Sequence, residues 1–238
     1  GGGGSNRITN HATPATYTIS SDTTDEDSQD ALIAIVSGVD VSATIDETLT
    51  HTTAGVTTGN CPNPGGAGSE TEIDTSGDPT TVPFGTINTE TFYGACQQIT
   101  VTTNGAGGYT TTVQTTSLLT SGSNTIAKGN CDGACSDSYE AVWATNTNNV
   151  FGYCMSDQTG NPASTADAGW GTNGCASVTT HFKTHANAGA SETAQSILAS
   201  ATPVSGDSAY IKYRLTVDGT QASGTYTTVV VYITTPTF

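Results

Sequence analysis

Residues 209–217 read AYIKYRLTV, and this stretch decides the fold class. Small or apolar side chains occupy every second position, with Tyr, Lys, Arg and Thr between them. Such a period of two predicts a β-strand. The turn-rich segment 218–224, DGTQASG, predicts a reversal of the chain. Residues 226–233 should then return as a strand, and the run Val229-Val230-Val231 predicts burial on both faces, hence a central strand.

Similar signals recur along the chain and are separated by segments rich in Gly, Pro, Ser and Asp. They predict strands over 14–20, 39–45, 82–92, around Ile99 and Val101, and over 109–119. The Gly-rich segment 104–108 predicts a hairpin between the last two. Residues 31–36 are apolar on both faces and fit either a short buried helix or a central strand. Residues 191–198, with Ser191 as N-cap, form the one plausible helix.

Composition supports the same class and excludes several functions. The chain holds 48 Thr and 28 Gly, and its formal net charge is -16 with only five Lys and Arg. So few cations argue against nucleic acid as a partner and against anionic membrane surfaces. No apolar run is long enough for a membrane span, so we expect no membrane insertion. We therefore predict an all-β protein, a two-sheet β-sandwich of jelly-roll or Ig-like type.

The six cysteines predict disulfides. A zinc site would need pairs of closely spaced ligands, whereas Cys131 and Cys135 are the one close pair and their neighbours are Gly, Asp and Ser. Six cysteines allow 15 connectivities, and we take sequential pairing as the expectation: Cys61 with Cys96, Cys131 with Cys135, and Cys154 with Cys175. Disulfides indicate an oxidising compartment. The sequence shows no secretion signal, so we expect a mature, exported chain at the cell surface.

The chain is predicted to have two parts. Residues 1–20 would form an N-terminal arm, and residues 21–238 a single β-sandwich with a Cys-rich insertion at 129–178. Within the arm, Ala15, Tyr17 and Ile19 alternate with Thr, as in a strand with one apolar face. These three side chains could enter a neighbouring subunit as a donor strand. Pairing of residues 14–20 within their own sandwich is the alternative.

No residue pattern points to catalysis, and we expect no enzyme. The chain lacks a G-x-S-x-G motif. His181 and His185 are four residues apart, which on a strand is about 13 Å, too far for one metal ion. We expect this pair to be solvated. No cofactor is expected, although two acidic clusters are weak candidates for structural calcium. Their members are Asp25, Asp27 and Asp30 in one, and Asp132, Asp137 and Glu140 in the other.

Two blocks resemble a family of secreted surface proteins from uncultivated bacteria of the candidate phyla radiation. One block is CQQITVTTN at 96–104 followed by GYTTTV at 108–113. The other begins with PVSGD at 203–207, continues through 210–217 and ends with GTYTTVVVYITTPTF at 224–238. The likeness covers roughly 38–128 and 180–238, and it implies no site residues. More loosely, the chain is similar to fibre subunits assembled by donor-strand exchange.

These observations predict a structural subunit of an extracellular surface filament. Its partners would be copies of itself, joined head to tail through β-strand pairing, since such contacts propagate and do not close. The alternative is an adhesin or carbohydrate-binding module that binds a host or cell-surface glycan. Its stacking platforms would be Trp143, Tyr153 and Trp170 in the Cys-rich region. Packing of both Trp beneath that region is the alternative.

Overall fold

The structure is a computed structural model, and its description covers most of the chain. The described residues are 14–20, 30–36, 38–61, 70–129, 131–133, 135–159, 164–166, 175 and 181–238. The chain divides into two units, Gly1–Asp46 and Glu47–Phe238. The sequence predicted a boundary after residue 20, whereas the first unit extends to residue 46. The reason is that the alternating segment 14–20 pairs with residues 30–35 of the same unit.

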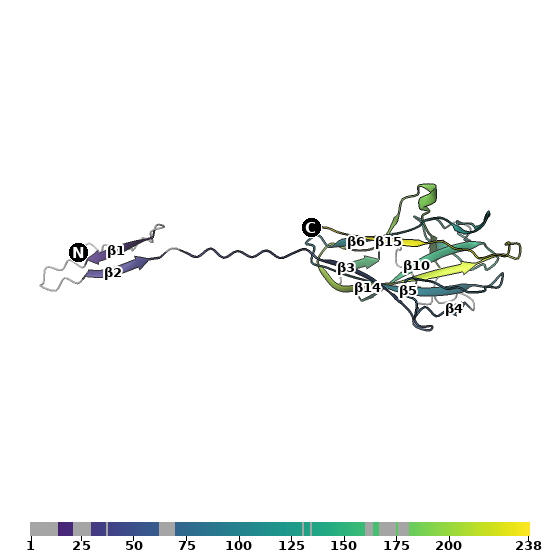
Figure 1. The fold of residues 1–238 in the computed structure, drawn as a ribbon, viewed down its shortest axis with the longest axis horizontal. Helices are drawn as coiled ribbons and strands as arrows, with labels where there is room; N and C mark the ends of the chain where they lie inside the picture. Colours follow the sequence, from purple (N-terminus) through teal and green to yellow (C-terminus); the bar gives the residue numbers. More distant parts are fainter. Residues whose placement is uncertain are drawn as a thin grey trace, which may run out of the picture. The chain divides into compact units, whose positions relative to one another are not determined.

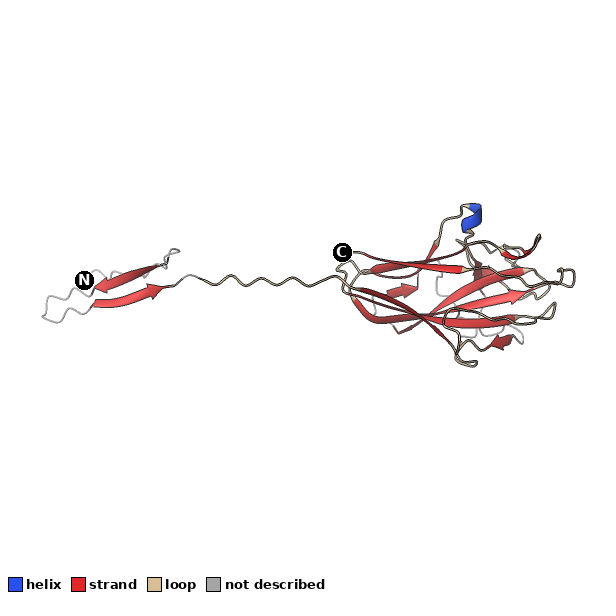
Figure 2. Cartoon of the chain, viewed as in Figure 1, coloured by secondary structure: helices blue, strands red, loops and turns tan. Residues whose placement is uncertain are grey.

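The described secondary structure is almost wholly β, as predicted (Figure 2). Its one helix among the described residues is a three-residue 3₁₀ turn, η1 (Ala188–Ala190). No helix in the described ranges is long and apolar enough to cross a bilayer. The strands are β1 (Ala15–Ser20), β2 (Asp30–Ile35), β3 (Leu49–Gly55), β4 (Thr71–Ile73), β5 (Tyr93–Thr103), β6 (Tyr109–Thr115), β7 (Leu119–Ser121), β8 (Asn124–Ile126), β9 (Ala141–Val142), β10 (Val150–Thr159), β11 (Ser164–Ala166), β12 (His181–Thr184), β13 (Gln195–Ser200), β14 (Val204–Thr216) and β15 (Val230–Pro236).

The first unit contains an antiparallel pair of strands. β1 pairs with β2 in a register that runs from Ala15 opposite Ile35 to Ser20 opposite Asp30. Leu32 in β2 is 72% exposed. Residues 31–36 are therefore neither a buried helix nor a central strand. Their apolar run belongs to the two-stranded β1-β2 sheet, in which the side chains of Leu32 and Ile33 are exposed.

The second unit is a two-sheet sandwich, which confirms the predicted fold class (Figure 1). The larger sheet has the strand order β3-β5-β14-β10-β12-β9, with β4 paired to β5. The smaller sheet has the order β11-β13-β6-β15. A short β7-β8 hairpin stands beside them. The jelly-roll or Ig-like assignment within this class stays a prediction.

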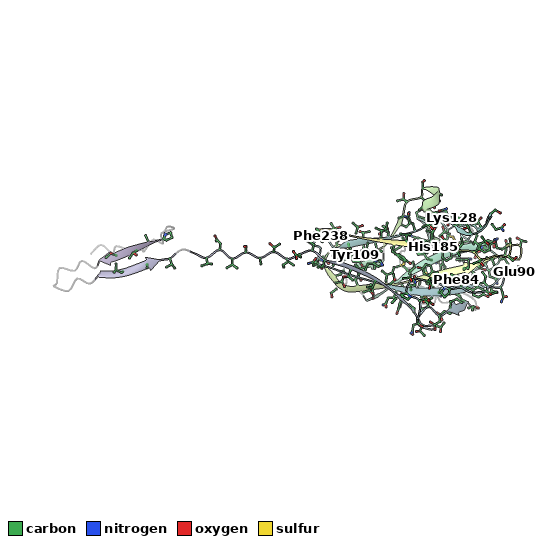
Figure 3. The ribbon with its side chains drawn as sticks, viewed as in Figure 1. Phe84, Glu90, Tyr109, Lys128, His185 and Phe238 are labelled. Carbon is green, nitrogen blue, oxygen red and sulfur yellow. A yellow bond between two sulfur atoms is a disulfide. The ribbon has the colours of Figure 1, made fainter. Side chains whose placement is uncertain are left out.

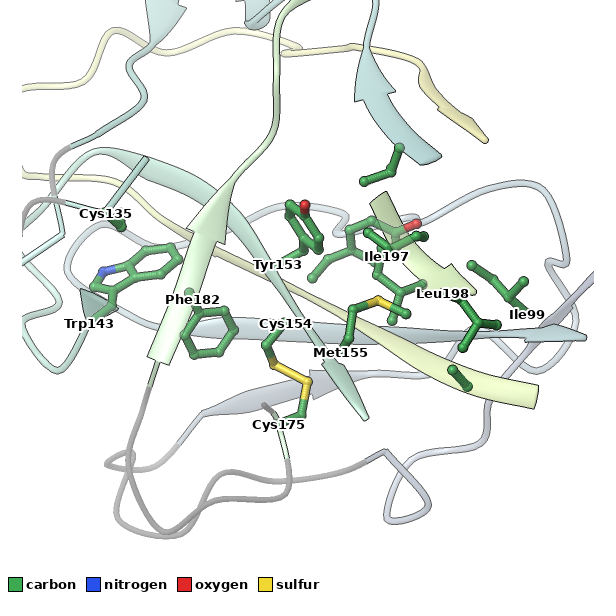
Figure 4. Close-up of a cluster of buried hydrophobic side chains, with 14 of the residues drawn as sticks. Ile99, Cys135, Trp143, Tyr153, Cys154, Met155, Cys175, Phe182, Ile197 and Leu198 are labelled. Carbon is green, nitrogen blue, oxygen red and sulfur yellow. A yellow bond between two sulfur atoms is a disulfide. The ribbon is translucent and has the colours of Figure 1, made fainter. Parts of the chain in front are cut away.

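The core between the sheets is formed by apolar side chains of the central strands. Ile99 from β5, Met155 from β10 and Ile197 and Leu198 from β13 are all buried and belong to one cluster (Figure 4). Alternate residues of a strand project to opposite faces. The disulfide of Cys154 therefore lies on the other face of β10 from Met155, over the outside of the larger sheet.

Strand pairing differs from the predicted hairpins. β5 and β6 were expected to pair across 104–108, and the last two strands across 218–224. In both cases the two strands lie in different sheets, so each connection crosses the sandwich. β15 is an edge strand and not the central strand that its Val run predicted. Alternation shows which side chains are buried, but it does not show which neighbour supplies the hydrogen bonds.

Three other local predictions are wrong. Residues 82–92 contain no strand, since Pro83 and Gly85 interrupt the ladder. The helix predicted at 191–198 is replaced by β13, whose Ile197 and Leu198 are drawn into the core. Residues 39–45 are not paired as a strand, and the side chains of Val39, Val41 and Ile45 are 83–90% exposed.

The Cys-rich region is more integral to the sandwich than an insertion. Its strand β10 lies between β14 and β12 in the larger sheet. All three predicted disulfides, Cys61–Cys96, Cys131–Cys135 and Cys154–Cys175, are confirmed. Cys96 and Cys154 both lie opposite Lys212 of β14 in the antiparallel register. Residues that face each other in this way project from one face, so two of the disulfides cover the outside of the larger sheet.

Removing each disulfide should cost stability in the order of the loops that they close. The sequence separations are 35, 21 and 4 residues. Loop-closure entropy then predicts losses of about 4, about 3.5 and about 2 kcal/mol for paired Cys→Ala variants of Cys61–Cys96, Cys154–Cys175 and Cys131–Cys135. Equilibrium unfolding in urea measures these differences. A larger loss from the Cys131–Cys135 variant than from the other two would contradict the loop-length explanation.

Candidate functional site

The residues predicted to mediate assembly lie in β1. Ala15, Tyr17 and Ile19 face Ile35, Ile33 and Ala31 of β2 in the register. One edge of this strand is therefore occupied within its own chain, and residues 14–20 do not join the sandwich sheets. The predicted alternation is present, but its partner is a local strand.

The proposed stacking platforms do not form an exposed surface. Trp143 and Tyr153 are fully buried. Trp143 packs edge-to-face against Phe92 and Phe182 with ring centroids 5.8 and 5.5 Å apart. Trp170 lies outside the described residues. The prediction that Trp143 and Tyr153 are exposed stacking platforms is wrong, because both side chains are buried.

The calcium candidates that the structure describes do not form a common site. Asp25 and Asp27 lie outside the described residues, and Asp30 begins β2. Asp132 accepts hydrogen bonds from the backbone N–H groups of Ala144 and Thr145 at 2.8 and 2.9 Å. No cluster of three His, Cys, Asp or Glu side chains suited to a metal occurs in the described ranges.

The remaining two acids of that cluster play local roles. The carboxylate of Asp137 accepts a hydrogen bond from the N–H of Ser138 at 3.1 Å. Glu140 is half-buried, and burial raises the pKa of its carboxyl against the opposing charges of His181 and Lys183. Within the part of the chain that the structure describes, no contact brings Asp137 or Glu140 together with Asp132.

A buried charge cluster on the outside of β14 was not predicted. The Nζ of Lys212 lies 2.9 Å from one carboxylate oxygen of Glu70, and Nη2 of Arg214 lies 2.8 Å from the other. Arg214 also donates from Nη1 to the carbonyl of Trp143 at 2.8 Å. Its guanidinium stacks on Phe92 and Phe182, 4.1 and 4.6 Å from the ring centroids. Burial lowers the pKa of Arg214, while the Glu70 carboxylate opposes that shift.

Two glycines make room for this cluster. Gly94 of β5 and Gly152 of β10 lie on either side of Arg214 in the register. A Cβ at Gly94 would stand 1.4 Å from the Glu70 carboxylate, and one at Gly152 would stand 2.6 Å from the carbonyl of Lys183. The sequence signal was the pattern Lys212-x-Arg214 in a strand whose alternate positions, such as Ile211 and Leu215, are apolar, with Gly in both flanking strands.

Neutralising the shared carboxylate should destabilise the fold strongly. Glu70→Gln keeps the shape but leaves Lys212 and Arg214 buried without a counter-charge, so we expect a loss of about 3–5 kcal/mol. The matched control is Glu192→Gln, which breaks the partly exposed pair with Lys128 and should cost less than about 1 kcal/mol. Urea unfolding compares the two variants. Equal losses would show that the buried cluster contributes no more than a surface pair.

His185 is buried among aromatic rings, contrary to the predicted solvated pair. Its ring stacks on Phe151 at 4.9 Å and lies 4.4 Å from the ring of Tyr153. Neither ring nitrogen has a hydrogen-bond partner among the described residues. The ring borders a cavity of about 10 Å³ that Lys128 also lines, the lower limit for one water molecule. Figure 3 labels both residues. Burial, with a smaller effect of Lys128, lowers the pKa of His185 to about 3.

This histidine should make the fold sensitive to mild acid. In the unfolded chain His185 takes up a proton near its ordinary pKa of about 6.5, whereas the folded protein takes it up only near pH 3. Its stabilising contribution is therefore complete above pH 6.5 and falls by about 1.4 kcal/mol per pH unit below it. Unfolding free energies between pH 7 and pH 5 measure this slope.

His185→Phe is the variant that tests the assignment, because it keeps an aromatic ring and removes the titration. Its stability should change less between pH 7 and pH 5 than that of the native protein. Some slope should remain, since burial also lowers the pKa of His51. An unchanged slope in the variant would assign the acid sensitivity to other groups.

One side of the sandwich ends in two edge strands, each paired on one side only. β3 is the edge of the larger sheet and β15 the edge of the smaller, with no strand beyond either among the described residues. They face each other across the sandwich, since His51 Nδ1 and Thr234 Oγ1 are 2.6 Å apart. The rings of His51 and Tyr232 are 6.1 Å apart. We call this side, formed by β3 and β15, the open seam.

The open seam is incompletely covered. The side chains of His51 and Thr53 in β3 and of Val230, Tyr232 and Thr234 in β15 face the interior but are only half-buried. The corresponding positions of the central strand β14, such as Ile211 and Tyr213, are fully buried. The core therefore extends to this side without a strand to close it.

The backbone of β15 presents free hydrogen-bonding groups outward. Thr237 exchanges hydrogen bonds with the two residues that precede β6, donating to the carbonyl of Gly108 and accepting from the N–H of Gly107. In an antiparallel pair, successive residues direct their backbone N–H and C=O groups alternately toward the partner strand and away from it. The N–H and C=O groups of Tyr232 and Thr234 therefore point away from β6. Pro236, which has no N–H, falls in the same outward set, where an edge strand tolerates it.

Comparison with known proteins gives no further guide. No known protein family, curated protein or solved structure matches this chain. The functional argument therefore depends on the geometry of the chain itself.

Proposed function

We propose that this chain is the structural subunit of an extracellular surface filament, assembled by pairing of β-strands between copies. The observation that carries the proposal is the open seam. Soluble sandwiches ordinarily protect such edges with Lys, inward charges, bulges or Pro. β3 and β15 contain no charged residue, and their one Pro, Pro236, is at the very end of β15.

The distribution of charge supports strand pairing over other contacts. Of the five cations in the sequence, Lys183, Lys212 and Arg214 are buried, and Lys128 is paired with Glu192. Arg7 lies outside the described residues. The surface of the second unit is thus almost purely acidic, and two copies have hardly any cations with which to form ion pairs. Hydrogen bonding between backbones at an uncharged edge strand requires no ion pairs.

An extracellular location follows as part of the same proposal. The second unit has three disulfides and no free cysteine among its described residues. Disulfides of this kind persist in oxidising compartments. They would also hold each subunit together where a filament is exposed to conditions outside the cell.

Electron microscopy and sedimentation of the purified protein test the proposal. We expect long polymers at modest protein concentration, and their amount should rise as NaCl is raised toward 0.3 M. The reason is that salt screens the repulsion between copies of net charge -16 over a Debye length of about 10 Å at 0.1 M. A protein that remains monomeric at all salt concentrations, or polymers that dissolve as salt rises, would contradict it.

A further inference from the structure

Residues 39–45 have the sequence of a strand but no partner strand among the described residues. Val39, Val41, Ala43 and Ile45 alternate with Asp40, Ser42 and Thr44. Its three large apolar side chains are 87%, 90% and 83% exposed, and no strand of the described chain pairs with it (Figure 1). β-branched residues in alternation are what a half-buried strand position favours. We call these seven residues the exposed segment.

We infer that the exposed segment of one copy adds as a strand to the outward edge of β15 in the next copy. The inference rests on the proposed filament function and assigns its donor and its acceptor. The apolar face of the segment would lie over the open seam and cover the half-buried Tyr232, Thr234 and His51. The outward N–H and C=O groups of β15 would pair with the segment's backbone.

The lengths and charges of the two partners agree. The exposed segment and β15 both have seven residues, or about 23 Å at about 3.3 Å per residue. Asp40 is the only charge in either, and it lies on the polar face of the segment. Contact between the two therefore joins segments that carry only one charged side chain between them, although both molecules are strongly acidic.

The donor comes from another copy because the chain cannot readily fold back. Only Asp46, Glu47 and Thr48 separate the exposed segment from β3. A reversal within three residues favours Gly or Asn, and neither is present. Donation to a neighbour joins two different surfaces, so each added copy offers a new free edge and the assembly grows as a fibre.

The donor is tested with two variants that carry the same added charge. Val41→Asp places a carboxylate on the apolar face of the exposed segment, and Ser42→Asp places one on its polar face. Val41→Asp should remain monomeric in electron microscopy and sedimentation at 0.3 M NaCl, while Ser42→Asp should polymerise like the native protein. Both residues are exposed outside the sandwich, so an unchanged melting temperature should confirm that both variants fold.

Ala15→Asp is included to separate this assignment from a donor in β1. Polymers of Val41→Asp like those of the native protein would overturn the inference, whether or not Ala15→Asp blocks assembly. That outcome would leave the filament function standing, because the native protein would still polymerise. Failure of the native protein itself to polymerise would instead refute the function on which the inference rests.

The acceptor is tested by disulfide trapping between chains. Ser42→Cys protein with an affinity tag is mixed with untagged Ile233→Cys protein under mild oxidation. Ile233 is 49% exposed on the outer face of β15, and paired residues on one face lie about 5 Å apart. We expect a tagged–untagged dimer on non-reducing gels. A parallel mixture with Thr52→Cys on β3 should give at least tenfold less, and the reverse ratio would move the acceptor to β3 and overturn the assignment.

Discussion

The burial of both faces of β14 is the constraint on which the rest of the structure depends. One face contributes Ile211 and Tyr213 to the space between the sheets. The other face carries Lys212 and Arg214, which are equally buried. Two cations removed from water require a counter-charge and a full set of hydrogen bonds. Glu70 supplies the counter-charge, and the aromatic layer around Trp143 keeps water away.

That requirement explains where the cysteines lie. Among the described residues, Phe92, Trp143 and Phe182 cover the guanidinium of Arg214 on the outside of the larger sheet. Cys61–Cys96 and Cys154–Cys175 place two disulfides on the same face, at β5 and β10, the two neighbours of β14. The described covering therefore lies over the middle strands of the sheet.

The sequence predicts the features that depend on local pattern. It misses those that depend on which strands and side chains come together in the fold. It predicts the all-β class, the three disulfides and the apolar positions of β14, because period and cysteine spacing are local. It misses the pairing of β15, since alternation looks the same in an edge strand and a central one. It also misses the buried cluster around Arg214, because a Lys or Arg between apolar residues ordinarily points to water.

The charge of the chain acquires a more specific meaning from the structure. Burial and pairing remove the described cations from the surface, so the acidic side chains on the outside of the sandwich have almost no exposed cation beside them. A surface of this kind repels other copies wherever side chains meet side chains. The backbone of an edge strand is neutral, and its hydrogen bonds with another strand do not depend on side-chain charge. An uncharged, unblocked edge such as β15 is therefore the contact that the proposed self-association would use.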